Sequence, residues 1–155
     1  MNIKQKRLSP SEQDGFTIVE LLIFIIVIGM LTILIVSSFA SFKQKERNSE
    51  RQKDVKALQV AIEGYYAQNG RYPTLNNLNE SSWRGKNIKA IEADDLKDPK
   101  GVDSKLVGAP KSNVYSYEVH ADDDTDCDNS TKDCTKYKLT ATYEGGQTFV
   151  KTNLN

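Results

Sequence analysis

Nineteen uncharged residues in succession, LLIFIIVIGMLTILIVSSF at positions 21–39, dominate the N-terminal part of this 155-residue chain. A helix needs about 20 apolar residues to cross the hydrocarbon core of a bilayer, and this run has that length. A cleaved secretory signal instead has an apolar region of about 7–15 residues followed by a small-residue A-x-A site. The residues at positions 37–40, SSFA, do not match such a site. The run therefore predicts a helix that inserts into a membrane.

A single carboxylate, Glu20, immediately precedes this apolar run. A charge near membrane depth costs several kcal/mol unless it is paired or protonated. No Lys or Arg lies within one helical turn of Glu20, so a cation must come from a chain terminus or from another molecule. Cleavage between Gly15 and Phe16 would create an α-amine close to Glu20, and an α-amine is protonated near neutral pH. In an assembly that amine could belong to a neighbouring copy, which would neutralise both charges and fix the axial register.

The residues from Gly15 to Leu22, GFTIVELL, follow a short leader that carries charges and precede the apolar run. This arrangement resembles the processing site of the type IV pilins and pseudopilins. The resemblance implies that a membrane prepilin peptidase cuts between Gly15 and Phe16 and methylates the new N-terminal residue, Phe16. It also implies that Glu20 pairs with the N-terminus of a neighbouring subunit during filament assembly. The leader, residues 1–15, would then lie in the cytoplasm.

One long helix is expected from Phe16 to Asn69, because no proline interrupts this segment. Its first half, residues 16–42, is the transmembrane or filament-core half, and its second half, residues 43–69, is amphipathic. Apolar residues at three- and four-residue spacing predict one buried stripe on the second half, made of Val55, Leu58, Ile62 and Tyr65 or Tyr66. The mixed charges at positions 43–54 favour a solvated face, with contacts between subunits as the alternative.

The remaining residues predict a small sheet packed on this stripe, which makes the expected fold class α+β. Asn69-Gly70 and then Pro73 end the helix, and residues 70–114 predict an irregular connection with one short helix around positions 89–96. We expect this connection to be anchored to the core by three apolar residues, Leu75, Leu78 and Trp83. Residues 115–155 predict a three-stranded antiparallel meander with strands at positions 114–120, 136–143 and 147–152.

The loop between the first two strands, ADDDTDCDNSTKDC, contains both cysteines of the chain. Two cysteines this close in a hairpin loop beyond a membrane favour a disulfide between Cys127 and Cys134. Carboxylates in this loop have a spacing that loosely mimics a calcium loop, although the central glycine is absent. The candidate calcium ligands are Asp122, Asp124, Asp126, Asp128 and Asp133. Some pseudopilins bind calcium in a C-terminal loop, so the resemblance supports this hypothesis; the alternative is an exposed acidic loop without an ion.

Composition excludes several classes of function. The chain has 21 basic and 21 acidic side chains, so it lacks the basic character expected of a nucleic-acid-binding domain. One His and two Cys cannot supply a zinc cluster and leave little for a catalytic constellation. We therefore expect no enzyme, no direct nucleic-acid site and no cofactor other than the calcium considered above.

The expected function is that of a type IV pilus subunit, which is cleaved and polymerised through its N-terminal helix for motility, adhesion or DNA uptake. The partners that the resemblance implies are other pilin subunits, the prepilin peptidase, the membrane assembly platform and, before assembly, the lipid bilayer. The subunit would be a single-pass inner-membrane protein before assembly and part of an extracellular filament afterwards. Two alternatives stay open: a pseudopilin of a type II secretion or competence system, and a monomeric membrane-anchored module that binds calcium or a partner.

Overall fold

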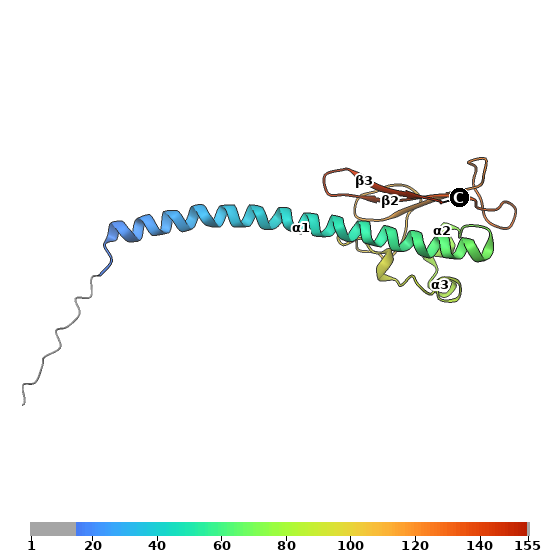
Figure 1. The fold of residues 1–155 in the computed structure, drawn as a ribbon, viewed down its shortest axis with the longest axis horizontal. Helices are drawn as coiled ribbons and strands as arrows, with labels where there is room; N and C mark the ends of the chain where they lie inside the picture. The colour runs from blue at the N-terminus through green and yellow to red at the C-terminus, as the bar shows by residue number, and fades with distance from the viewer. Residues whose placement is uncertain (1–14, 155) are drawn as a thin grey trace, which may run out of the picture. The chain divides into compact units, whose positions relative to one another are not determined.

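A computed structural model describes residues 15–154 and contains one long helix, three short helical segments and three strands (Figure 1). The elements are α1 (Ile18–Asn69), α2 (Leu75–Asn79), α3 (Ser81–Asn87), a 3-10 turn η1 (Asp94–Leu96), β1 (Ser116–His120), β2 (Lys136–Thr142) and β3 (Thr148–Thr152). This architecture confirms the predicted α+β fold. The chain divides into two compact units, one ending at Ser41 and a second, called the head, that begins at Phe42.

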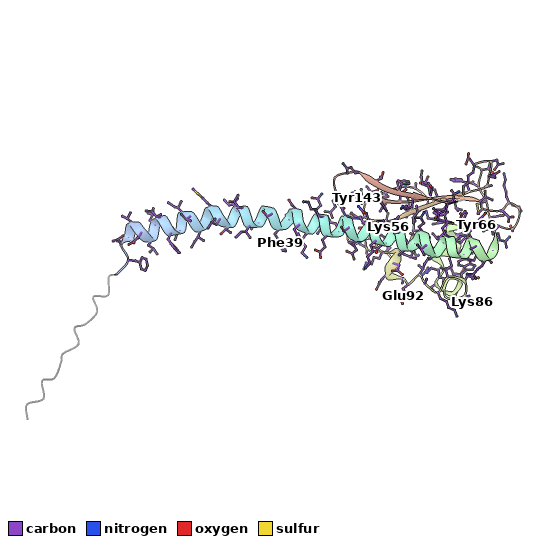
Figure 2. All side chains as sticks on the ribbon, in the orientation of Figure 1. Phe39, Lys56, Tyr66, Lys86, Glu92 and Tyr143 are labelled. Carbon is purple, nitrogen blue, oxygen red and sulfur yellow. A yellow bond between two sulfur atoms is a disulfide. The ribbon has the colours of Figure 1, made fainter. Side chains whose placement is uncertain are left out.

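The N-terminal unit contains the apolar half of α1. Its large apolar side chains project on every side of the helix around Phe39 (Figure 2), and all of them are between 47% and 86% exposed. Within the described part of the chain, α1 is the one helix long and apolar enough to cross a membrane. A helix that is apolar all round needs lipid or other helices around it. This property agrees with membrane anchoring.

The head contains a three-stranded antiparallel sheet in the order β1-β2-β3. β1 pairs with β2 through Tyr117 opposite Leu139, and β2 pairs with β3 through Ala141 opposite Phe149. The turn between β2 and β3 contains Gly145 and Gly146 at φ angles of 111° and 88°, a backbone region that favours glycine. The predicted meander is confirmed, with each strand within two residues of the expected bounds.

The second half of α1 provides the core stripe on which the sheet packs. Val55, Leu58 and Ile62 are fully buried, together with Tyr117 and Leu139 of the sheet. In Figure 1 the strands run along one side of this half of α1, and α3 lies on the opposite side. The stripe is therefore buried as its periodicity predicts.

The connection between α1 and β1 is more helical than predicted, and the short helix expected around positions 89–96 is present only as the 3-10 turn η1. The structure has α2 and α3 before that segment, and only η1 within it. α2 begins with a capping box, in which Thr74 Oγ1 accepts from Asn77 N and the Asn77 side chain accepts from Thr74 N. The N3 position of a capping box is usually Glu or Gln, and here it is Asn77, so the sequence did not indicate this helix start.

The three apolar anchors of the connection are confirmed. Leu78 is fully buried, and Leu75 is partly buried against the core. The ring of Trp83 in α3 lies 5.2 Å from the ring of Tyr65, centroid to centroid. These contacts fix α2 and α3 on the head.

Candidate functional site

The residues of the predicted processing and assembly site lie at the start of α1. Gly15, Phe16 and Thr17 precede the helix, and the Phe16 side chain is 86% exposed. The Glu20 carboxylate accepts hydrogen bonds from the backbone N–H and the hydroxyl of Thr17, each at 3.2 Å. Glu20 N in turn donates to Thr17 Oγ1 at 3.2 Å. The structure thus brings Thr17 and Glu20 together as a capping box.

This capping box was not anticipated from the sequence, although its signal, Thr17-x-x-Glu20, is present. In the uncleaved chain it gives the Glu20 carboxylate a local partner before any assembly. The partner is a pair of neutral donors, and within residues 15–154 no basic side chain pairs with Glu20. The Glu20 carboxylate therefore has no cationic partner among the described residues, and one could come from outside this segment. Cleavage at Gly15 and pairing of Glu20 with a neighbour's terminus both stay predictions.

The loop between β1 and β2 is closed by a disulfide between Cys127 and Cys134, as the sequence predicts. The residues after α1 hold this loop: Tyr72 N donates to Cys134 O at 2.8 Å. Asn129 Nδ2 donates to Tyr72 O at 2.7 Å, and Asn129 Oδ1 accepts from Cys134 N at 2.8 Å. Arg71 donates to Asn129 O at 3.0 Å. The disulfide loop is therefore docked on the end of α1.

Two acidic residues of this loop are bound to partners within the loop itself. Lys132 Nζ lies 2.5 Å from a carboxylate oxygen of Asp123, and this pairing lowers the pKa of Asp123 to about 2. The backbone N–H groups of Thr131 and Ser130 donate to Asp128 at 2.8 and 2.9 Å, which holds the pKa of Asp128 well below its ordinary value. These carboxylates are charged at neutral pH and stabilise the loop conformation.

The structure does not gather the five predicted calcium ligands. Lys136 Nζ lies 3.2 Å from Asp124 and 4.0 Å from Asp122, and Arg71 pairs with Asp133 at 3.3 Å. In the residues that the structure describes, no group of three or more His, Cys, Asp or Glu side chains is arranged to hold a metal ion. Calcium binding to this loop stays a prediction of the sequence, which calorimetric titration of the purified chain with Ca²⁺ will decide.

We expect removal of the disulfide to destabilise the head by about 2–3 kcal/mol, because the bond closes a short loop in the unfolded chain. The change is the double substitution Cys127→Ala and Cys134→Ala. The measurement is chemical unfolding of the full chain in detergent, followed by the fluorescence of Trp83, the single tryptophan. An unchanged unfolding midpoint, with the bond verified in the wild-type chain, would contradict this expectation.

A second polar cluster, at the other end of the head, ties α1 to the sheet and to the segment before β1. Arg51 and Asp98 are both buried and form a bidentate ion pair, with N···O distances of 2.6 and 2.9 Å. Arg47 donates to both carboxylate oxygens of Glu144, in the turn between β2 and β3. Lys100 lies 3.4 Å from Glu144. Pairing with Arg47 lowers the pKa of Glu144 to about 2.

This ion-pair cluster corrects one expectation from the sequence. The solvated face that the mixed charges favour is present at Lys43 and Glu46, which form an exposed ion pair at 2.8 Å. For Arg51 the expectation was wrong, because its side chain is fully buried. A signal was available: Arg51 lies four residues before Val55, in phase with the buried stripe.

No family model and no solved structure matches the chain. Type II secretion system core protein G of Escherichia coli (strain K12) is 31% identical over 104 residues, which cover 67% of this chain and 70% of that protein. Core protein G of Aeromonas hydrophila is 36% identical over 62 residues, 40% of this chain and 43% of that protein.

A type IV pilin is also among the similar proteins. The type IV major pilin protein PilA of Myxococcus xanthus (strain DK1622) is 29% identical over 75 residues, 48% of this chain and 34% of that protein. The match to the Escherichia coli protein, at 104 residues, is twice as long as the 52-residue α1. That similarity therefore extends beyond the helix into the head.

Proposed function

Because this chain belongs to the type IV pilin and pseudopilin family, we propose that it is a pilus subunit, made as a membrane-anchored precursor and polymerised through α1. The observation that carries the proposal is the placement of Glu20 as the one acid of an otherwise apolar, exposed helix half. The role is structural and not catalytic. The filament would extend from the cell surface.

The proposed assembly begins with cleavage by a prepilin peptidase between Gly15 and Phe16, outside the regular helix. Cleavage creates a protonated α-amine on Phe16, which the peptidase methylates. An assembly platform in the membrane would then bring subunits together. Residues 16–42 would leave the lipid and pack with other copies, exchanging one apolar environment for another, so helix packing and the Glu20 ion pair supply specificity.

A second candidate, a pseudopilus subunit of a type II secretion system, is favoured by one specific observation. The match to core protein G covers 104 residues and 67% of this chain, whereas the match to the pilin PilA covers 75 residues and 48% of it. Both candidates share the precursor, the cleavage and the packing of α1. They differ in where the processed subunit is found.

The test is intact mass and N-terminal sequencing of the subunit recovered from two fractions of the source cells, sheared extracellular material and envelope. A chain beginning at methylated Phe16 in the sheared fraction is the expected result and supports the pilus. The same processed chain found in the envelope alone supports the pseudopilus. An unprocessed chain beginning at Met1 and found in membranes alone would overturn both and favour the monomeric anchored module.

A further inference from the structure

An apolar groove lies between the second half of α1 and the segment after α3, with a volume of about 610 Å³. On the α1 side the lining includes Ala57, Val60, Ala61 and Gly64, whose spacings of three, one and three residues place them on one side of the helix. On the other side the lining includes Ile88 and Ala90. Val60 is 72% exposed, whereas Leu58 and Ile62 beside it in sequence are fully buried. Ala61 and Tyr65 at the edge of this face pack against the core, whereas Val60 is left uncovered within the described head.

Gly64 is unexplained by the fold of the single chain. Glycine weakens a helix interior compared with alanine. A Cβ atom added to Gly64 would meet nothing within 4 Å, so packing inside this chain does not require a glycine. Small residues on a helix do allow the close approach of another chain. The small residues on the α1 side of the groove would therefore let another chain approach the helix backbone closely.

The head also carries a projecting apolar tip, Val102, which is 88% exposed. The turn before it is held firmly: Gly101 N donates to Asp98 O at 2.7 Å, and Lys100 N donates to Asp98 Oδ1 at 2.8 Å. Asp98 itself is fixed by the buried ion pair with Arg51. Val102 is therefore presented at one place on the head.

The groove lining is basic, and the tip segment carries one acid, Asp103, together with Lys100 and Lys105. The groove lining contains two lysines, Lys56 and Lys89, and no acidic residue. Asp103 directly follows Val102, and the neighbouring Lys100 lies 3.4 Å from Glu144 of its own chain. Leu154, near the end of the described chain, is also strongly exposed and apolar. It is preceded by Asn153 and not followed by an acidic residue as Val102 is.

The two surfaces also lie at different levels along α1. The Val102 turn is anchored at Arg51, whereas the groove extends from Lys56 to Gln68. When one surface of a subunit binds a different surface of the next identical subunit, the same contact can be repeated from copy to copy. If the rotation between successive copies does not close a ring, the result is a helical filament.

We propose that the Val102 turn of one copy seats in the α1 groove of the next copy, as a head-to-head contact along the filament. The proposal rests on the proposed filament function and adds to it the two surfaces that the heads use. Val102 contacts the floor at Ala57, Ala61 and Gly64, and Asp103 faces Lys56 and Lys89.

Cysteine cross-linking in sheared filaments tests this contact. The double variant Val60→Cys and Val102→Cys, oxidised briefly, is expected to give a ladder of dimers, trimers and higher multimers on a non-reducing gel. Each single variant is expected to give no species above a dimer. A matched control pairs Val102→Cys with Leu154→Cys, since Leu154 is 75% exposed and lies outside the groove. A ladder from the control, or none from the test pair in normal filaments, would overturn the contact.

A second experiment fills the groove. Gly64→Leu is expected to reduce sheared filament at least tenfold without lowering the unfolding midpoint or the amount of precursor in the membrane. The matched control is Gly85→Leu, because Gly85 also has nothing within 4 Å of an added Cβ and does not line the groove. Normal filament from Gly64→Leu would overturn the contact and leave the filament function standing. Absence of filament or pseudopilus from wild-type cells would overturn both.

Discussion

Glu20→Ala should remove filament from the sheared fraction, by at least a hundredfold, while cleaved subunit accumulates in the membrane. Within an apolar filament core the α-amine of a neighbouring subunit needs an anionic partner, and an unpaired buried charge costs about 3–5 kcal/mol. Each 1.4 kcal/mol is a factor of ten in an equilibrium constant. Loss of that much at each added subunit exceeds a hundredfold. The measurement is immunoblotting of sheared and membrane fractions.

Glu20→Gln separates the charge from the capping role of this side chain. Glutamine keeps an oxygen that accepts from Thr17, as the carboxylate does at 3.2 Å, but carries no charge. If charge pairing drives assembly, Glu20→Gln fails as Glu20→Ala does. Wild-type amounts of filament from Glu20→Gln would show that capping suffices and would contradict the ion pair. Glu46→Ala is the control, because Glu46 is an exposed acid of the same helix, 53% exposed.

The features that local sequence fixes were predicted well. The long helix begins at Ile18, within two residues of the prediction. In lipid a single apolar segment without proline can satisfy its backbone hydrogen bonds only as a helix. The strands were recognised from alternation and from Gly145-Gly146, which suits the turn. The disulfide followed from the spacing of two cysteines in one loop. Each of these signals lies within one continuous segment of the chain.

Features that depend on distant partners were missed. Arg51 appeared to belong to a solvated charged face, because its partner, Asp98, is 47 residues away in sequence. Calcium binding to the disulfide loop stays a prediction from the spacing of its carboxylates, and the pairing of Asp124 with Lys136 was not predicted. Periodicity assigns a residue to a face, and only the fold shows which opposite charge meets it there.

Breaking the buried ion pair should cause the largest loss of head stability. In Asp98→Asn the buried guanidinium of Arg51 loses its bidentate counterion and keeps only the longer contact with Glu144, at 3.4 Å, which costs about 3 kcal/mol. The loss comes from an uncompensated charge, so removing both charges, with Arg51→Met added to Asp98→Asn, should recover most of the stability. The measurement is chemical unfolding of each full chain in detergent, with the fluorescence of Trp83 as probe.

Arg47→Met tests whether burial, and not the number of charges, sets this effect. Arg47 pairs with Glu144 at comparable distances, but its side chain is 28% exposed, so solvent screens the pair and we expect a much smaller loss of stability than in Asp98→Asn. Equal losses from Asp98→Asn and Arg47→Met would contradict the distinction. Because the Asp98 side chain also accepts from Lys100 N in the turn before Val102, Asp98→Ala should reduce filament more than Asp98→Asn, since asparagine keeps an oxygen that accepts there. The buried pair then serves two purposes, since the same carboxylate that neutralises Arg51 positions the tip proposed to contact the next subunit.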